Sequence, residues 1–242
     1  MDTLAGILER FNRKERNLLI RDILDCRDRP LPLAKDFCQR LADAIGVDRE
    51  LLEGAWWATD FHFDWLAGAL LTFMRGETLK RQENTHNLIM GNQEDLDLVV
   101  VAHDPSGATP HHLILIEAKA YGGFTNKQWE SKVARLEQLY AFYKGLELDS
   151  DHRIGFHYVL YSPTKPARLN PKPLPWQAQD GKEPLPIQHI ELKLAFPKSS
   201  ILAVSRCNEA EEPDAKGAFW RCIKLPQTGP LPDEDATIGA SL

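Results

Sequence analysis

Apolar side chains recur at helical spacing in three stretches of the first third of the chain. These stretches cover residues 1–25, 34–45 and 60–74. Pro30 and Pro32 separate the first two, because proline disrupts the helical hydrogen-bond ladder. Gly46 follows the second stretch, where a glycine commonly ends a helix. We therefore expect helices in the N-terminal region and a further helix that begins near Asp60.

The period of the pattern changes after residue 76, where short β-rich runs alternate with turns. Strands are predicted at 84–90, 96–102, 113–118 and 154–161, and a helix at 126–146. With the helix at 60–74, these elements give an α-β-β-β-α-β order, which is typical of an α/β fold. Additional strands are predicted at 187–196, 201–204 and 219–225. The chain is thus divided into a helical region (1–55), a core with C-terminal strands (56–225) and a flexible tail (226–242).

The composition, with 43% hydrophobic and 26% charged residues, is that of an ordinary globular protein. No apolar run approaches the roughly 18–20 residues needed to cross a bilayer, and residues 1–16 carry no signal-peptide pattern. We therefore expect a cytoplasmic protein without a membrane partner. The net charge of −6 does not favour a general nucleic-acid coat protein, but a local basic groove would still permit a nuclease.

Acidic residues interrupt two of the predicted strands. Asp97 lies in the first of these runs, and Glu117 and Lys119 end the second. Side chains alternate along a strand, so Glu117 and Lys119 share one face. The turn-like sequence at 104–110 permits a hairpin, which would place Asp97 beside Glu117 and Lys119.

A carboxylate at the end of four aliphatic residues is costly unless it is paired or bound to a metal. Two carboxylates and the backbone carbonyl of Ala118 suit a hard cation such as Mg²⁺, which prefers oxygen ligands. Such a metal polarises phosphates and activates water, and the ammonium of Lys119 would stabilise negative charge that develops nearby. A structural ion pair between Glu117 and Lys119 is the competing interpretation.

Asp97 followed by a leucine and three valines, and Glu117-Ala118-Lys119 at the end of a second apolar strand, resemble the PD-(D/E)xK nuclease superfamily. The resemblance covers residues 60–162 and departs from the family pattern in having Leu96 where a proline is usual. It implies a restriction-endonuclease-like αβββαβ core with a helical N-terminal extension and extra C-terminal strands. It also implies that Asp97 and Glu117 bind Mg²⁺ or Mn²⁺ and that Lys119 positions the attacking water.

Members of that superfamily often add an acidic residue from the first core helix. Asp64 is the preferred candidate for a metal ligand and catalytic residue here, and Asp60 and Glu77 are alternatives. A cap or a solvated acid is the competing interpretation. Gln128 is a further catalytic candidate by resemblance, and the basic side of its helix, residues 127–135, would meet a nucleic-acid backbone.

The sequence therefore predicts a metal-dependent nuclease, a hydrolase that cleaves phosphodiester bonds and has DNA as its expected substrate. Two alternatives stay open. One is a catalytically silent module of the same fold that binds nucleic acid or protein. The other is an interaction subunit of a defence or repair complex that docks through the helices of residues 1–46, which would equally serve a homodimer.

Overall fold

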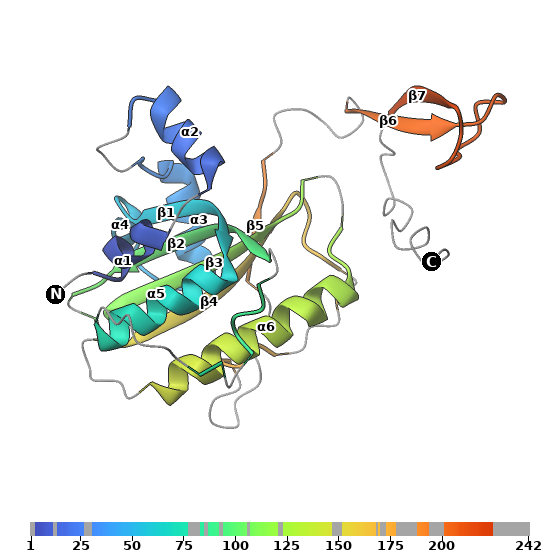
Figure 1. Cartoon of the computed structure of the whole chain (residues 1–242). Coiled ribbons are helices and arrows are strands. Elements are labelled where there is room, and N and C mark those ends of the chain that lie inside the picture. Colours follow the sequence, from blue (N-terminus) through green and yellow to red (C-terminus); the bar gives the residue numbers. More distant parts are fainter. Residues whose placement is uncertain are drawn as a thin grey trace. The chain divides into compact units, whose positions relative to one another are not determined.

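The computed structural model describes most of the chain. The described residues are 3–11, 14–26, 31–76, 83–84, 87–91, 94–105, 107–120, 123–146, 152–167, 169, 173–177, 188–193 and 201–224. They form two compact units (Figure 1). The first consists of residues 1–118, 125–161 and 167–190, and the second of 119–124, 162–166 and 191–242. The predicted tail, 226–242, and Glu77 lie outside the described residues.

A five-stranded mixed sheet forms the centre of the first unit, with the strand order β1-β2-β3-β4-β5. The strands are β1 (Trp56–His62), β2 (Asp95–His103), β3 (His111–Ala118), β4 (Ile154–Ser162) and β5 (Gln188–Glu191). The β1–β2 and β2–β3 pairs are antiparallel, and β4 runs parallel to β3. A parallel neighbour requires a crossover connection, and α6 (Asn126–Gly145) lies in that connection.

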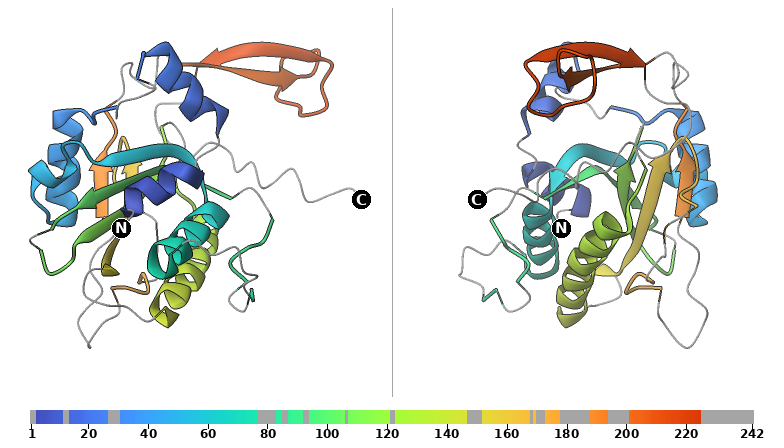
Figure 2. Two further views of the ribbon diagram at one scale, coloured as in Figure 1. Left: turned by 60° about the vertical axis from the view of Figure 1, so that its left-hand side comes forward. Right: turned by 90° about the vertical axis from the view of Figure 1, so that its right-hand side faces the viewer.

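Helices cover both faces of this sheet (Figure 2). The remaining helices of the unit are α1 (Leu4–Phe11), α2 (Glu15–Ile23), α3 (Lys35–Ile45), α4 (Arg49–Leu52) and α5 (Phe63–Arg75). On one face, Cys38 and Leu41 of α3 pack with Val100, Ile114 and Val159 in a fully buried cluster. On the other face lie α5 and α6, which contact each other. The predicted α/β class is thus confirmed, as three layers with the apolar strands in the middle.

The order of the core elements differs from the prediction in one strand. The described residues of the predicted first strand, 84 and 87–90, form no strand. The neighbour of β2 is instead β1, which precedes α5, so the order from residue 56 is β-α-β-β-α-β. The predicted α-β-β-β-α-β order was wrong in this respect, because no strand was expected before the helix at 60–74.

The helix after β1 begins three residues later than predicted. Asp60 lies within β1 at φ 52, a left-handed conformation that Asp tolerates better than most residues. The N-cap is His62, whose Nδ1 accepts a hydrogen bond from the Asp64 N–H at 3.2 Å. The interpretation of Asp60 as a cap of this helix was therefore wrong.

The predicted N-terminal helix is two helices, α1 and α2. α1 packs against α5 and β2, with Leu4, Ile7 and Leu8 buried. A Cβ at Gly68 of α5 would lie 2.9 Å from the Phe11 ring of α1, so any larger residue at this position would make that ring shift. α2 differs from α1 in that most of its large apolar side chains are exposed. These are Leu18, Leu19 and Ile23, with Leu24 at the C-cap.

The second unit contains an antiparallel pair, β6 (Leu202–Cys207) and β7 (Phe219–Lys224). Both strands were predicted. The Arg206 side chain donates to the Gly217 carbonyl from Nε and Nη2, at 3.0 and 2.7 Å, and so ties the connecting loop to β6. Within the described residues, no helix is both long and apolar enough to cross a membrane.

Candidate functional site

Asp97 and Glu117 meet where the β2–β3 pairing ends. The antiparallel register runs from His103 opposite His111 to Leu98 opposite Ile116. One step further in this register, Asp97 comes opposite Glu117. There the Asp97 side chain replaces a ladder carbonyl: its Oδ2 accepts a hydrogen bond from the Ala118 N–H at 2.7 Å. This short bond fixes the Asp97 carboxylate against the end of β3.

The oxygen atoms at this position are of the kind that bind a hard cation. In an extended strand, the N–H and C=O of one residue point to the same side. Because the Ala118 N–H points to Asp97, its carbonyl belongs to the same side of β3. The carboxylates of Asp97 and Glu117 and this carbonyl are the oxygen donors that Mg²⁺ prefers. No group of three His, Cys, Asp or Glu side chains suited to a metal is present in the part of the chain described. The fit therefore depends on two carboxylates and one carbonyl.

A lysine from α6 lies beside the Glu117 carboxylate. Lys132 Nζ is 3.4 Å from Glu117 Oε2 and 3.6 Å from Glu94 Oε1. It also donates to the Asp95 carbonyl at 3.0 Å. Only 12% of the Lys132 side chain is exposed. Lys132 is thus a nearly buried cation with three oxygen atoms around its ammonium group, supplied by the beginning of β2 and the end of β3.

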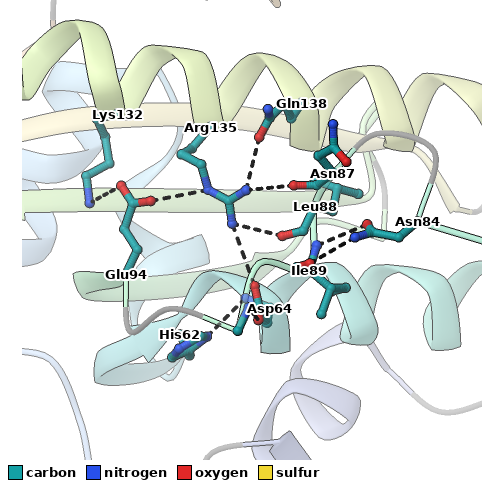
Figure 3. Close-up of polar contacts among 11 residues, drawn as sticks. His62, Asp64, Asn84, Asn87, Leu88, Ile89, Glu94, Lys132, Arg135 and Gln138 are labelled. Atoms are coloured by element: carbon teal, nitrogen blue, oxygen red, sulfur yellow. Dashed lines mark hydrogen bonds and ion pairs between the residues drawn. The ribbon is translucent and has the colours of Figure 1, made fainter.

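Arg135 joins the same network one helical turn further along α6 (Figure 3). Its Nε lies 3.2 Å from Glu94 Oε2, and its Nη2 lies 3.6 Å from Asp64 Oδ1. The guanidinium also donates to the carbonyls of Asn87 and Leu88 at 3.1 and 2.9 Å. Glu94 therefore lies between the two cations of α6, with one carboxylate oxygen toward each (Figure 3).

The carboxylates of this region act on a buried tyrosine of β4. Burial, followed by the negative charges of Glu117, Asp97 and Glu94, raises the pKa of Tyr158 well above its usual range. Tyr158 lies on β4 and is 2% exposed. Two carboxylates at the start of β2 and one at the end of β3 thus act on the same buried phenol.

Asp64 lies in the first turn of α5 and is held away from the end of the hairpin. Its Oδ1 faces Arg135, and its Oδ2 accepts a hydrogen bond from the Gly91 N–H at 3.3 Å. Its connection to Glu117 passes through Arg135, Glu94 and Lys132. Figure 3 shows the part of this path from Asp64 to Lys132. The structure therefore brings Asp97 and Glu117 together and links Asp64 to them only indirectly.

The other candidates occupy separate positions. Asp60 pairs with Arg16, whose Nη1 lies 3.2 Å from both of its carboxylate oxygens. Gln128 is exposed in the first turn of α6, where its backbone N–H is capped by Thr125 Oγ1 at 3.2 Å. Lys119 is half-buried and directly follows β3, and it belongs to the second unit.

Three members of the network, Glu94, Lys132 and Arg135, were not predicted as metal ligands or catalytic residues. Glu94 precedes β2 by one residue, and nothing in the periodicity distinguishes it. Arg135 was expected on a basic surface for a nucleic-acid backbone, but its side chain is only 7% exposed and is engaged with protein oxygens. That expectation was wrong. The sequence did carry one sign that Arg135 is buried. It lies four residues before Leu139, which places it at the edge of the apolar stripe of α6.

Comparison of the chain with protein-family models, with curated proteins and with solved structures gives no match. The chemistry of the site therefore has to follow from its own residues and from the resemblance of its motif.

Proposed function

We propose that this protein is a metal-dependent phosphodiesterase that acts on nucleic acid, with DNA as the expected substrate. The observation that supports this most directly is the 2.7 Å hydrogen bond from Ala118 N–H to Asp97 Oδ2 at the end of the β2–β3 pairing. It sets one carboxylate against the Glu117–Ala118 segment, at the point where the motif of the PD-(D/E)xK superfamily would hold its metal.

In this proposal Asp97, Glu117 and the Ala118 carbonyl hold Mg²⁺ or Mn²⁺. When bound, such a metal polarises a phosphate and lowers the pKa of a coordinated water. Lys119, two residues after Glu117, orients the attacking water and stabilises the negative charge that develops on the phosphate. Asp64 acts through Arg135 as a positioning residue, since its carboxylate contacts that guanidinium and the Gly91 N–H. Gln128 is exposed and is assigned to substrate contact.

A catalytically silent module of the same fold is the second candidate. The ion pair between Lys132 and Glu117 favours it, because an ammonium 3.4 Å away already supplies countercharge to this carboxylate. A silent module would need no metal to accommodate Glu117. The two candidates therefore differ in metal binding and in cleavage.

The test is cleavage of plasmid and single-stranded DNA with Mg²⁺ or Mn²⁺, comparing the wild type with Asp97→Asn and Lys119→Ala. An asparagine at 97 keeps an oxygen that can accept the Ala118 N–H, so the substitution removes charge with little change in the strand ends. We expect each variant to lose on the order of 100-fold or more in rate, as is typical when electrostatic stabilisation of a transition state is removed.

Lys144→Ala is the matched control, because Lys144 is an exposed lysine in the last turn of α6. It should cut like the wild type. Cleavage that survives in Asp97→Asn and Lys119→Ala would contradict the proposed site. Absence of both cleavage and metal binding in the wild type would favour the silent module.

A further inference from the structure

The ammonium group of Lys132 occupies the candidate site in the way that a bound cation would, with protein oxygens around it. Its ammonium is surrounded by Glu117 Oε2, Glu94 Oε1 and the Asp95 carbonyl, at 3.4, 3.6 and 3.0 Å. Carboxylate and carbonyl oxygens are also the ligands of divalent cations. The same carboxylate, Glu117, is thus a partner of Lys132 and a proposed ligand of the metal.

We infer that Lys132 is a built-in countercation of this site, which a divalent metal must displace from Glu117 in order to bind. The inference rests on the proposed function for the identity of the metal site. Lys132 is a positioning residue in this account: it sets the affinity for the metal and is not itself a ligand.

Two features of the structure support this competition. Lys132 keeps two other oxygen partners, Glu94 and the Asp95 carbonyl, so it can leave Glu117 without becoming an isolated buried charge. Its Nζ also lies 5.4 Å from the ring centroid of Phe63 in α5, within the range of a cation–π contact. The ammonium therefore has a place to remain when Glu117 turns to a metal.

The role of Glu94 follows from the same contacts. Glu94 attracts Lys132 away from Glu117, and Arg135 holds Glu94 by its second oxygen at 3.2 Å. Without the charge of Glu94, Lys132 would pair more strongly with Glu117 and the metal would bind more weakly. The inference therefore predicts opposite effects for two substitutions: removal of Lys132 tightens metal binding, and neutralisation of Glu94 weakens it.

The experiment is calorimetric titration of Mn²⁺ into the full chain, with no substrate present. We expect Lys132→Met to bind Mn²⁺ about 10-fold more tightly than the wild type, which corresponds to about 1.4 kcal/mol for the lost competition. Glu94→Gln should bind several-fold more weakly. Lys144→Met, a loss of an exposed lysine on the same helix, should leave the affinity unchanged.

The double variant Lys132→Met/Glu94→Gln separates this account from one in which Glu94 is itself a ligand. If Glu94 acts mainly through Lys132, Glu94→Gln weakens Mn²⁺ binding much less in the Lys132→Met background than in the wild type. If Glu94→Gln weakens binding equally in both backgrounds, Glu94 acts on the metal directly and the inference is overturned. If Lys132→Met does not fold, Lys132→Gln keeps a polar side chain of similar reach and carries the same expectation.

The outcomes also distinguish this inference from the proposed function. Equal or weaker Mn²⁺ binding by Lys132→Met, with binding lost in Asp97→Asn, overturns the countercation and leaves the nuclease intact. Tighter binding by Lys132→Met without any DNA cleavage supports the countercation and counts against the nuclease. Absence of Mn²⁺ binding in every variant overturns both.

Discussion

The two ends of the β2–β3 hairpin differ in how they accommodate polar side chains. At one end, the carboxylate of Glu117 lies beside the ammonium of Lys132 at 3.4 Å. At the other end, the rings of His103 and His111 stack at 4.8 Å. The first end matches charges of opposite sign, and the second end brings together groups that can be neutral.

A second histidine pair at the imidazole end shows the consequence of burial. His112 Nδ1 and His157 Nε2 lie 3.1 Å apart on adjacent parallel strands. Burial, followed by the charge of His112, lowers the pKa of His157 to about 4. At one end, the cations of α6 offset the burial of ionised carboxylates. At the other end, no such partner offsets burial for His157, and its neutral form is favoured.

The largest effect on stability is expected from removing the ion pairs of Arg135 with Glu94 and Asp64. Arg135→Met would leave Glu94 and Asp64 without the guanidinium that lies between them, at a site where only 7% of the arginine side chain is exposed. Removal of one partner of a buried ion pair typically costs about 3–5 kcal/mol. Urea denaturation should show a loss of that size.

Arg40→Met is the matched control for this substitution. Arg40 forms an i, i+4 pair with Asp36 on α3, in which the Arg40 side chain is 22% exposed and the Asp36 side chain 61% exposed. Because water reaches the carboxylate of this pair, the loss should be below about 1 kcal/mol. A loss for Arg135→Met no larger than that of the control would mean that the network of Figure 3 contributes little to the fold.

The lowered pKa of His157 predicts that the stability of the protein depends on pH. Above pH 6.5, His157 is neutral in both the folded and the unfolded chain. As the pH falls from 6.5 toward about 4, His157 becomes protonated in the unfolded chain but stays neutral in the folded chain. The free energy of unfolding therefore decreases. Between pH 7 and pH 5 this one group costs about 2 kcal/mol of stability.

His157→Gln should remove this loss, so the difference in unfolding free energy between pH 7 and pH 5 should shrink by about 2 kcal/mol. The measurement is urea denaturation at the two pH values, with the exposed His103→Gln as the control. An unchanged difference in His157→Gln would show that protonation of this ring does not limit stability.

The smallest effect is expected from the exposed ion pair between Arg16 and Asp60. The Arg16 side chain is 79% exposed. Because exposed pairs contribute little, Arg16→Ala should change the free energy of unfolding by less than about 0.5 kcal/mol in urea denaturation. A larger loss would indicate that the unusual backbone of Asp60, at φ 52, depends on this arginine.

The elements that the sequence predicted well have strong and long patterns. The valine-rich run became β2 and the run ending in Glu117 became β3, because two buried faces require continuous apolar residues. The apolar stripe of α6 and the glycine at 46, which adopts φ 73 at the end of α3, were equally readable. These two strands and the turn between them were enough to predict that Asp97 lies beside the end of β3.

The rest depends on contacts between distant residues. β1 contains Asp60 in a left-handed conformation, and its strand character comes from pairing with β2 about forty residues later, which no local pattern reveals. Glu94 and Arg135 are likewise brought together by the packing of α6 on the sheet. Their types are ordinary for a surface, and only burial shows that they form a network.

The hydrogen bond from Ala118 to Asp97 also gives the chain a spectroscopic reporter. Most strand amides donate to carbonyls, whereas this one donates to a carboxylate at 2.7 Å, as a charge-assisted bond. The proton resonance of the Ala118 amide in a nitrogen-15 correlation spectrum therefore follows the electronic state of the Asp97 carboxylate directly. A single cross-peak can register an ion, a proton or a phosphate at the end of the hairpin, without substrate turnover and without a mutation.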